Sequence, residues 1–78
     1  SNRIIRANKF LGIHISTVFL GLDHNWGEGD PILFETMIFG GLMDQKYQDR
    51  YCTYKQAVRG HYRAIGYVIG YYFKSMLS

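Results

Sequence analysis

The chain has 78 residues, enough for one small domain, and a formal net charge of +3. Apolar residues make up 47% and aromatic residues 17% of the sequence, which excludes an intrinsically disordered chain, because such chains have too few apolar groups to form a core. The longest apolar stretch, Ala64 to Phe73, contains two glycines and is shorter than the roughly 18 residues that a membrane span requires.

The first half of the sequence predicts three β-strands. Residues 3–10 and 13–22 are rich in β-branched and aromatic side chains, and Gly12 between them permits a tight turn. Residues 32–39 form the third predicted strand. Residues 23–31 between the second and third strands have the Asp, Asn, Gly and Pro content of a loop. This arrangement predicts an antiparallel hairpin with a long loop.

The second half predicts one helix, from Tyr54 to about Lys74. Thr53 is the expected N-cap, and no acid follows three residues later to complete a capping box. Three glycines within the helix are each expected to cost about 1 kcal/mol relative to alanine. The predicted architecture is therefore a single small α+β domain over residues 1–78, a three-stranded antiparallel meander followed by one C-terminal helix (βββα). Residues at three- and four-residue spacing define the expected buried face of the helix: Tyr54, Ala57, Val58, His61, Ile65, Val68 and Tyr72.

Both faces of the predicted sheet are substantially apolar. Alternate residues of a strand face opposite sides, and each set in the second and third strands contains several apolar side chains. A single helix covers only one face of such a sheet, and large exposed apolar patches usually mark interaction sites. We therefore expect the protein to self-associate or to dock onto a partner through the uncovered face. The alternative is a sheet that curls tightly and hides both faces itself.

Charge is unevenly distributed along the chain. All six acidic residues lie between positions 23 and 49, and all but one of the nine basic residues lie outside that range. Lys55, Arg59 and Arg63 are spaced i, i+4 and i+8, and they form a basic stripe on the predicted helix, beside Tyr62. Like charges at this spacing destabilise an isolated helix, so an acidic surface is expected to offset them. The candidates are the protein's own acidic loop, a second subunit, a protein partner, or nucleic acid, which basic residues interleaved with aromatic ones bind.

A small group of polar residues is a candidate site for a metal or a small ligand. Asp23 and His24 begin the predicted loop, Glu35 lies in the next strand, and His61 faces the sheet from the helix. Their spacing matches no defined metal-binding motif. The structural interpretation, which we favour, is that these residues tie the loop and the helix to the sheet. Glu35 would then bind His61 or, as second choice, Arg50.

Enzymatic chemistry is not indicated. The single Cys52 has no obvious catalytic base beside it and excludes an internal disulfide. The loop glycines precede a strand, unlike those of a phosphate-binding fingerprint, and the twelve-residue calcium-loop pattern is missing. We expect no catalytic residues, no cofactor and no metal ion. With one cysteine and no secretory signal pattern, a reducing compartment is expected.

Four blocks of the sequence resemble a family of short bacteriophage and prophage proteins. They are residues 16–24 (STVFLGLDH), residues 33–41 (LFETMIFGG), residues 50–53 (RYCT), and Ala57 with Gly60 and His61. The resemblance implies a bacteriophage origin and action in the cytoplasm of the bacterial host, and it implies no particular activity. Family members often begin with an acidic helical segment, without which part of the sheet is left uncovered or covered by a partner. A polar site shared by the family would lie at Asp23, His24, Glu35, Arg50, Tyr51 and His61.

These observations favour a non-enzymatic, phage-encoded binding protein. It would act by self-association or by docking onto a bacterial host protein, with inhibition of a host defence complex as its purpose. The predicted interaction residues are Lys55, Arg59, Tyr62 and Arg63. One alternative is a nucleic-acid-binding protein that uses this stripe, and the other is a metal- or small-ligand-binding protein that uses Asp23, His24, Glu35 and His61.

Overall fold

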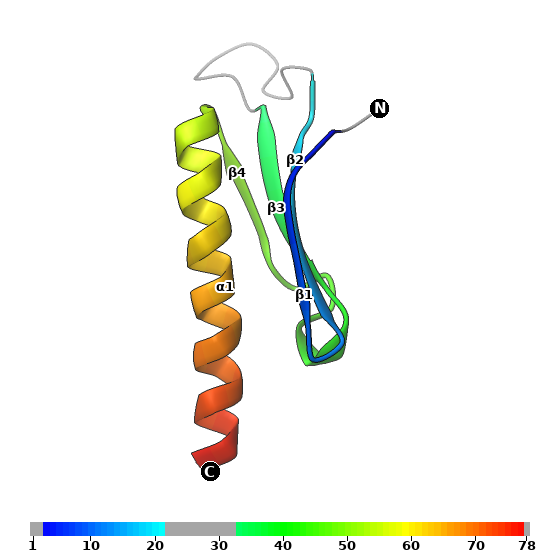
Figure 1. Ribbon diagram of the computed structural model, residues 1–78, viewed down its shortest axis with the longest axis vertical. Coiled ribbons are helices and arrows are strands. Elements are labelled where there is room, and N and C mark those ends of the chain that lie inside the picture. Colours follow the sequence, from blue (N-terminus) through cyan, green and yellow to red (C-terminus); the bar gives the residue numbers. More distant parts are fainter. Residues whose placement is uncertain (1–2, 22–32, 78) are drawn as a thin grey trace.

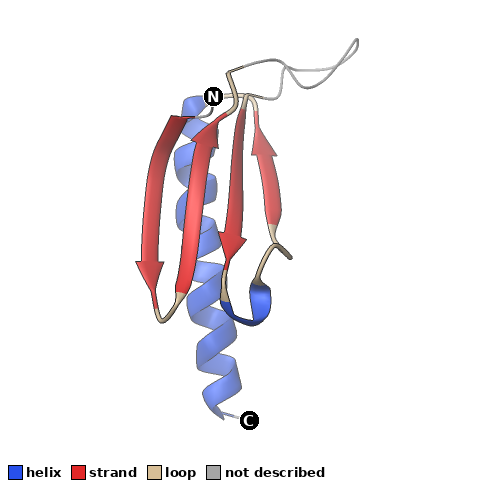
Figure 2. Ribbon diagram, turned by 90° about the vertical axis from the view of Figure 1, so that its right-hand side faces the viewer, coloured by secondary structure: helices blue, strands red, loops and turns tan. Residues whose placement is uncertain are grey.

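A computed structural model of the chain describes residues 3–21 and 33–77. Within these residues, each strand pairs antiparallel with the next, so the sheet is a four-stranded meander in the order β1-β2-β3-β4. The helix lies along one face of this sheet (Figures 1 and 2). The α+β class and the C-terminal helix are thus confirmed. The elements are β1 (Arg3–Phe10), β2 (Ile13–Phe19), β3 (Phe34–Phe39), a 3-10 turn (Gly41–Met43), β4 (Gln48–Tyr51) and α1 (Tyr54–Leu77).

Most predicted boundaries are close to the observed ones. β1 has the predicted bounds, whereas β2 ends at Phe19 and not at residue 22, because Gly21 adopts a φ of 80° that no strand residue has. β3 begins at Phe34; the predicted start at residue 32 and the predicted loop over 23–31 lie outside the described residues. α1 continues past Lys74 to Leu77, because no Gly or Pro follows to stop it.

The prediction of three strands is wrong, because β4 adds a fourth strand beside β3. Its sequence, Gln-Asp-Arg-Tyr, contains no β-branched residue, and of its four residues only Tyr51 favours a strand. Its pairing is specified by tertiary contacts instead: Arg50 lies opposite Glu35, and Tyr51 lies opposite Phe34. The register of β4 therefore depends on one ion pair and one aromatic neighbour, which local propensity does not reveal.

Two turns meet at the end of the sheet near the C-terminal half of α1. Leu11 and Gly12 connect β1 and β2 with φ values of 53° and 75°, the two positive angles that a tight two-residue hairpin turn requires. Gly40 follows β3, and a side chain there would overlap the backbone oxygen of Gly12. The predicted turn at Gly12 is confirmed, but Leu11 is an uncommon residue for the left-handed region.

A capping box fixes the start of α1, which corrects the expectation that none would form. The backbone N–H of Gln56 donates to Thr53 Oγ1 at 3.1 Å, and the backbone N–H of Thr53 donates to Gln56 Oε1 at 3.1 Å. The N–H of Cys52 donates to the same oxygen at 3.0 Å. Thr53 is the predicted N-cap. The second acceptor of the capping box is the side chain of Gln56 and not that of an acidic residue.

The core between the sheet and α1 contains two apolar clusters with a polar layer between them. One cluster lies around Phe34, Tyr51 and Ala57. The polar layer contains His61, which the periodicity correctly placed on the sheet-facing side of the helix. The other cluster consists of Ile13, Ile15, Ile38, Met43, Ala64 and Val68.

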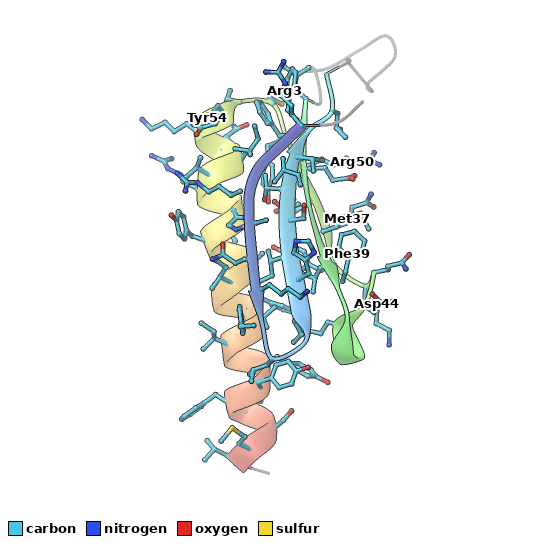
Figure 3. All side chains as sticks on the ribbon, turned by 45° about the vertical axis from the view of Figure 1, so that its right-hand side comes forward. Arg3, Met37, Phe39, Asp44, Arg50 and Tyr54 are labelled. Carbon is cyan, nitrogen blue, oxygen red and sulfur yellow. The ribbon has the colours of Figure 1, made fainter. Side chains whose placement is uncertain are left out.

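The uncovered face of the sheet is mixed rather than continuously apolar. Met37 and Phe39 point away from α1, and Arg50 lies on the same side (Figure 3). Phe39 is only 37% exposed and its ring lies against that of His14. The expected apolar patch is therefore broken by polar neighbours. By register, the polar residues of this face are Lys9, His14, Ser16, Glu35, Gln48 and Arg50, and the apolar ones are Ile4, Ala7, Val18, Met37 and Phe39.

Alanine substitutions at two helix glycines should have opposite effects on stability. A Cβ at Gly60 would overlap the ring of Tyr51, so Gly60→Ala should lower the free energy of unfolding by about 1–3 kcal/mol. Gly66 has open space around it, so Gly66→Ala should raise that free energy by about 0.5–1 kcal/mol. Denaturant unfolding of the two variants measures both effects. Equal stabilisation by the two variants would contradict the packing of Tyr51 against α1.

Candidate functional site

Four hydrogen bonds, three of them buried and the one to Asn8 partly buried, form a chain that joins β1, β2, β3 and β4 to α1. Tyr51 Oη donates to Thr36 Oγ1 at 3.1 Å, and Thr36 Oγ1 lies 2.5 Å from Thr17 Oγ1. Thr17 Oγ1 lies 2.7 Å from His61 Nδ1, and His61 Nε2 lies 2.7 Å from Asn8 Oδ1. We call these five residues the polar chain. It links β4, β3, β2, α1 and β1 in that order.

The polar chain has one consistent direction of donation. Asn8 Oδ1 can only accept, so His61 Nε2 carries the proton and His61 Nδ1 accepts from Thr17. Thr17 must then accept from Thr36, and Thr36 accepts from Tyr51. Each threonine hydroxyl thus donates once and accepts once. Among the described residues, no buried side-chain nitrogen or oxygen lacks a partner.

Burial keeps both titratable members of the polar chain neutral. It lowers the pKa of His61 below its ordinary value of 6.5, and the nearby charge of Arg6 acts in the same direction. Burial also raises the pKa of Tyr51 to about 12. His61 is 0% exposed, as are Thr17 and Thr36. These three side chains are inaccessible to solvent, and their hydrogen bonds hold α1 against the sheet.

A second polar group lies on the uncovered face of the sheet. Glu35 Oε2 accepts from Arg50 Nε at 2.8 Å and from Gln48 Nε2 at 2.6 Å. The predicted contact between Glu35 and His61 is wrong, because successive strand residues point to opposite faces and Glu35 points away from the helix. The second-choice partner, Arg50, is the observed one.

The structure therefore divides the predicted polar site. Glu35 and Arg50 lie on the uncovered face, whereas the side chains of Tyr51 and His61 lie between the sheet and α1. Asp23 and His24 lie outside the described residues. Over residues 3–21 and 33–77, no three His, Cys, Asp or Glu side chains gather in a group that could hold a metal ion.

Three members of the polar chain were missed from the sequence: Asn8, Thr17 and Thr36. Thr17 continues the inward-facing series of Ile13 and Ile15, and Thr36 follows Phe34 in the same way. A threonine in an inward position of each central strand was the available signal. Threonine also has high strand propensity, so from the sequence alone these two residues predict strand formation rather than a buried hydrogen bond.

The predicted basic stripe lies on the solvent side of α1. Lys55, Arg59 and Arg63 are exposed, and Arg63 Nη1 lies 3.4 Å from Asp49 Oδ2 of β4. On the opposite flank of the helix, the guanidinium of Arg6 lies 5.5 Å from the ring centroid of Tyr62. Within the described residues, no ion pair includes Lys55 or Arg59.

A polar groove of about 390 Å³ separates the stripe from β4. Arg59 and Arg63 of α1 border it, together with the single carboxylate of Asp49, whereas the guanidinium of Arg50 binds Glu35 on the uncovered face. Cys52 also lines it, at the start of the helix. The groove is thus an open, mainly basic surface suited to anionic side chains. Its lining residues are Asp49, Arg50, Tyr51, Cys52, Gln56, Arg59 and Arg63.

No protein-family model, curated protein or solved structure matches this chain. Within the part of the chain that the structure describes, no helix is long and apolar enough to cross a membrane. The function must therefore be inferred from the geometry of the two polar groups, the basic stripe and the apolar surface.

The stability of the protein should fall as the pH drops below about 6.5 because of His61. The unfolded chain takes up a proton on this histidine near its ordinary pKa of 6.5, whereas the lowered pKa keeps the folded form neutral. Stability is then fully present above pH 6.5 and is lost as the pH falls toward the folded pKa. Melting temperatures from pH 8 to pH 5 should decline more steeply in the wild type than in His61→Gln. An equal decline of the melting temperature in both proteins would contradict the assignment of this pH dependence to His61.

Glu35→Gln should cost little, less than about 1 kcal/mol, because its partner Arg50 is half-exposed and an amide oxygen still accepts a hydrogen bond. Urea unfolding of this variant at pH 7 measures the loss. Its pH profile between 5 and 7 should match that of the wild type, because Glu35 is not part of the polar chain. If Glu35→Gln lowered the free energy of unfolding as much as Thr17→Val does, the polar group on the uncovered face would contribute as much stability as the polar chain.

Proposed function

We propose that this chain is a non-enzymatic bacteriophage protein that docks onto an acidic surface of a bacterial host protein. The observation that carries the proposal is the basic stripe of Lys55, Arg59 and Arg63, whose first two members lack a carboxylate partner among the described residues. The bacteriophage origin rests on the sequence resemblance. Occupying and blocking a host defence complex is the purpose that such docking would serve.

Each acidic residue that the structure describes already has a partner, and only one of these partners, Arg63, belongs to the stripe. Glu35 binds Arg50, and Asp49 binds Arg63. Asp44 Oδ1 accepts from the backbone N–H of Gly40 at 2.6 Å. An external acidic surface is therefore a natural complement to the stripe, and complementary charges chiefly increase the rate and the specificity of association.

Two residues beside the basic stripe, Tyr62 and Asp49, favour a protein partner over nucleic acid. Arg6 lies over one face of the Tyr62 ring, so at most the other face is open to base stacking. The carboxylate of Asp49 lies in the polar groove beside Arg63 and would repel phosphate groups. An acidic peptide or protein surface can avoid this carboxylate more easily than a continuous phosphate backbone can.

A charge-reversal experiment tests the proposal. The double variant Arg59→Glu/Arg63→Glu should fold as the wild type does, because exposed charge pairs contribute about 0–1 kcal/mol each. Affinity capture from host lysate, with mass spectrometry, should recover a specific acidic protein with the wild type and not with the double variant. Lys46→Glu/Lys74→Glu changes the net charge equally at two other exposed sites and should retain the partner.

Two outcomes would contradict docking onto a protein. Failure of Arg59→Glu/Arg63→Glu to fold would make the stripe an internal structural element. Salt-sensitive retention of the wild type on single-stranded DNA at near-physiological ionic strength, lost in the same variant, would assign the stripe to nucleic acid instead.

A further inference from the structure

The C-terminal part of α1 extends past the ends of the strands (Figures 1 and 2). Beside it lies an apolar groove of about 450 Å³, bounded by the end of β1, the Leu11–Gly12 turn and the last turns of the helix. We call residues 69–77 the helix tail and this hollow the tail groove. The groove is lined by Asn8, Phe10, Leu11, Ile65, Ile69, Tyr72, Phe73 and Met76.

The side chains around the tail groove are unusually exposed for their type. Phe73 is 63% exposed and Met76 is 81% exposed, and Ile69 and Leu77 are also more than half exposed. Because large apolar side chains present about 150–250 Å² each, these residues leave several hundred Å² of apolar surface open to water. Patches of this size on a single chain usually mark a site of association.

The conformation of Leu11 independently marks the same surface. Its φ of 53° lies in the left-handed region, where asparagine or glycine is the ordinary choice for a two-residue hairpin turn. Its side chain is 78% exposed and borders the tail groove. Leu11 therefore occupies a strained backbone position although its side chain is not buried within its own chain. This indicates that the leucine contacts something outside the chain.

We propose that the tail groove binds a second copy of this chain, with the helix tail of each copy filling the groove of the other. A two-fold axis relates two such copies, so the same residues meet on both sides. The spacing of Ile65, Ile69, Tyr72 and Met76 alternates between four and three residues, which is the pattern by which two helices pack along a common seam. The surface is thus self-complementary.

Charge favours a second copy over another occupant. No charged side chain lines the tail groove, whereas the stripe and β1 are basic. A two-fold contact brings like surfaces together, so an uncharged patch is where this basic chain can self-associate without repulsion. Pairing through the edge strand β1 would instead bring together two sets of Arg3, Arg6 and Lys9, a charged pattern that discourages strand addition.

The exposed area also suits a dimer. Stable interfaces bury roughly 800 Å² on each partner, with an apolar centre. The exposed side chains of the helix tail supply several hundred Å² of the apolar centre that such an interface needs. The contact lies at the opposite end of α1 from Lys55 and Arg59, so it leaves the basic stripe available for the proposed docking.

Matched lysine substitutions test the dimer. By analytical ultracentrifugation, the wild type should dimerise at micromolar concentration. Phe73→Lys should raise the dimer Kd at least about tenfold, which corresponds to about 1.4 kcal/mol. Gly70→Lys adds the same charge to the same part of the helix, but Gly70 has open space around it and lines a different groove. This control should leave the dimer Kd unchanged.

Leu11→Asn provides a second readout that a merely structural role of Leu11 would not produce. Asparagine suits the turn better, so the melting temperature of the dilute monomer should rise. The dimer Kd should also rise, because the leucine contact is lost. An unchanged dimer Kd would overturn the proposal.

Three further outcomes would overturn it. These are a wild type that remains monomeric up to about 100 µM, equal effects of Phe73→Lys and Gly70→Lys, and a dimer that Met37→Lys on the uncovered face disrupts while Phe73→Lys does not. The variant Arg59→Glu/Arg63→Glu should still dimerise, so failure of the dimer and failure of the docking function are distinguishable.

Discussion

The polar chain from Tyr51 to Asn8 is the constraint on which the rest of the structure depends. It contributes one side chain from every strand and one from α1, all in a layer between two apolar clusters. Leaving one buried donor or acceptor without its partner costs about 1–3 kcal/mol, a large share of the stability that so small a domain has. Apolar packing alone would tolerate a helix that slides along the sheet. The polar chain allows one position, because His61 must reach both β2 and β1.

The sequence was sufficient for the elements whose signal is local. β-Branched residues in β1 and β2, Gly12 in the turn and the helical spacing around His61 all reflect propensity or periodicity, and the structure agrees with them. It was insufficient where the structure of a segment depends on contacts with residues distant in the sequence. β4 has little propensity for a strand and is defined by its pairing with Glu35 and Phe34. The sequence also could not show that Glu35 and His61 lie on opposite faces, since that depends on the register of β3.

α1 presents three different surfaces. Its sheet-facing side is closed by packing around Ala57, Ala64 and Val68. Its outer side near the N-terminus is basic, and its C-terminal part is apolar and extends past the sheet. A chain of this size has too little core to bury a helix of 24 residues completely. The unburied length is then available for contacts with other molecules, and the two exposed regions differ enough in chemistry to bind different partners.

The single direction of donation along the polar chain has a consequence for how this protein changes during evolution. Each of the five positions accepts or donates in a fixed sense, so a lone replacement such as Thr17→Val strands two neighbours at once. Any viable lineage must change such positions in compensating pairs or reverse the entire direction of donation. Sequences that descend from a common ancestor with this one should therefore show correlated substitution at positions 8, 17, 36, 51 and 61, while Arg59 and Phe73 on the surface vary with whatever each lineage binds.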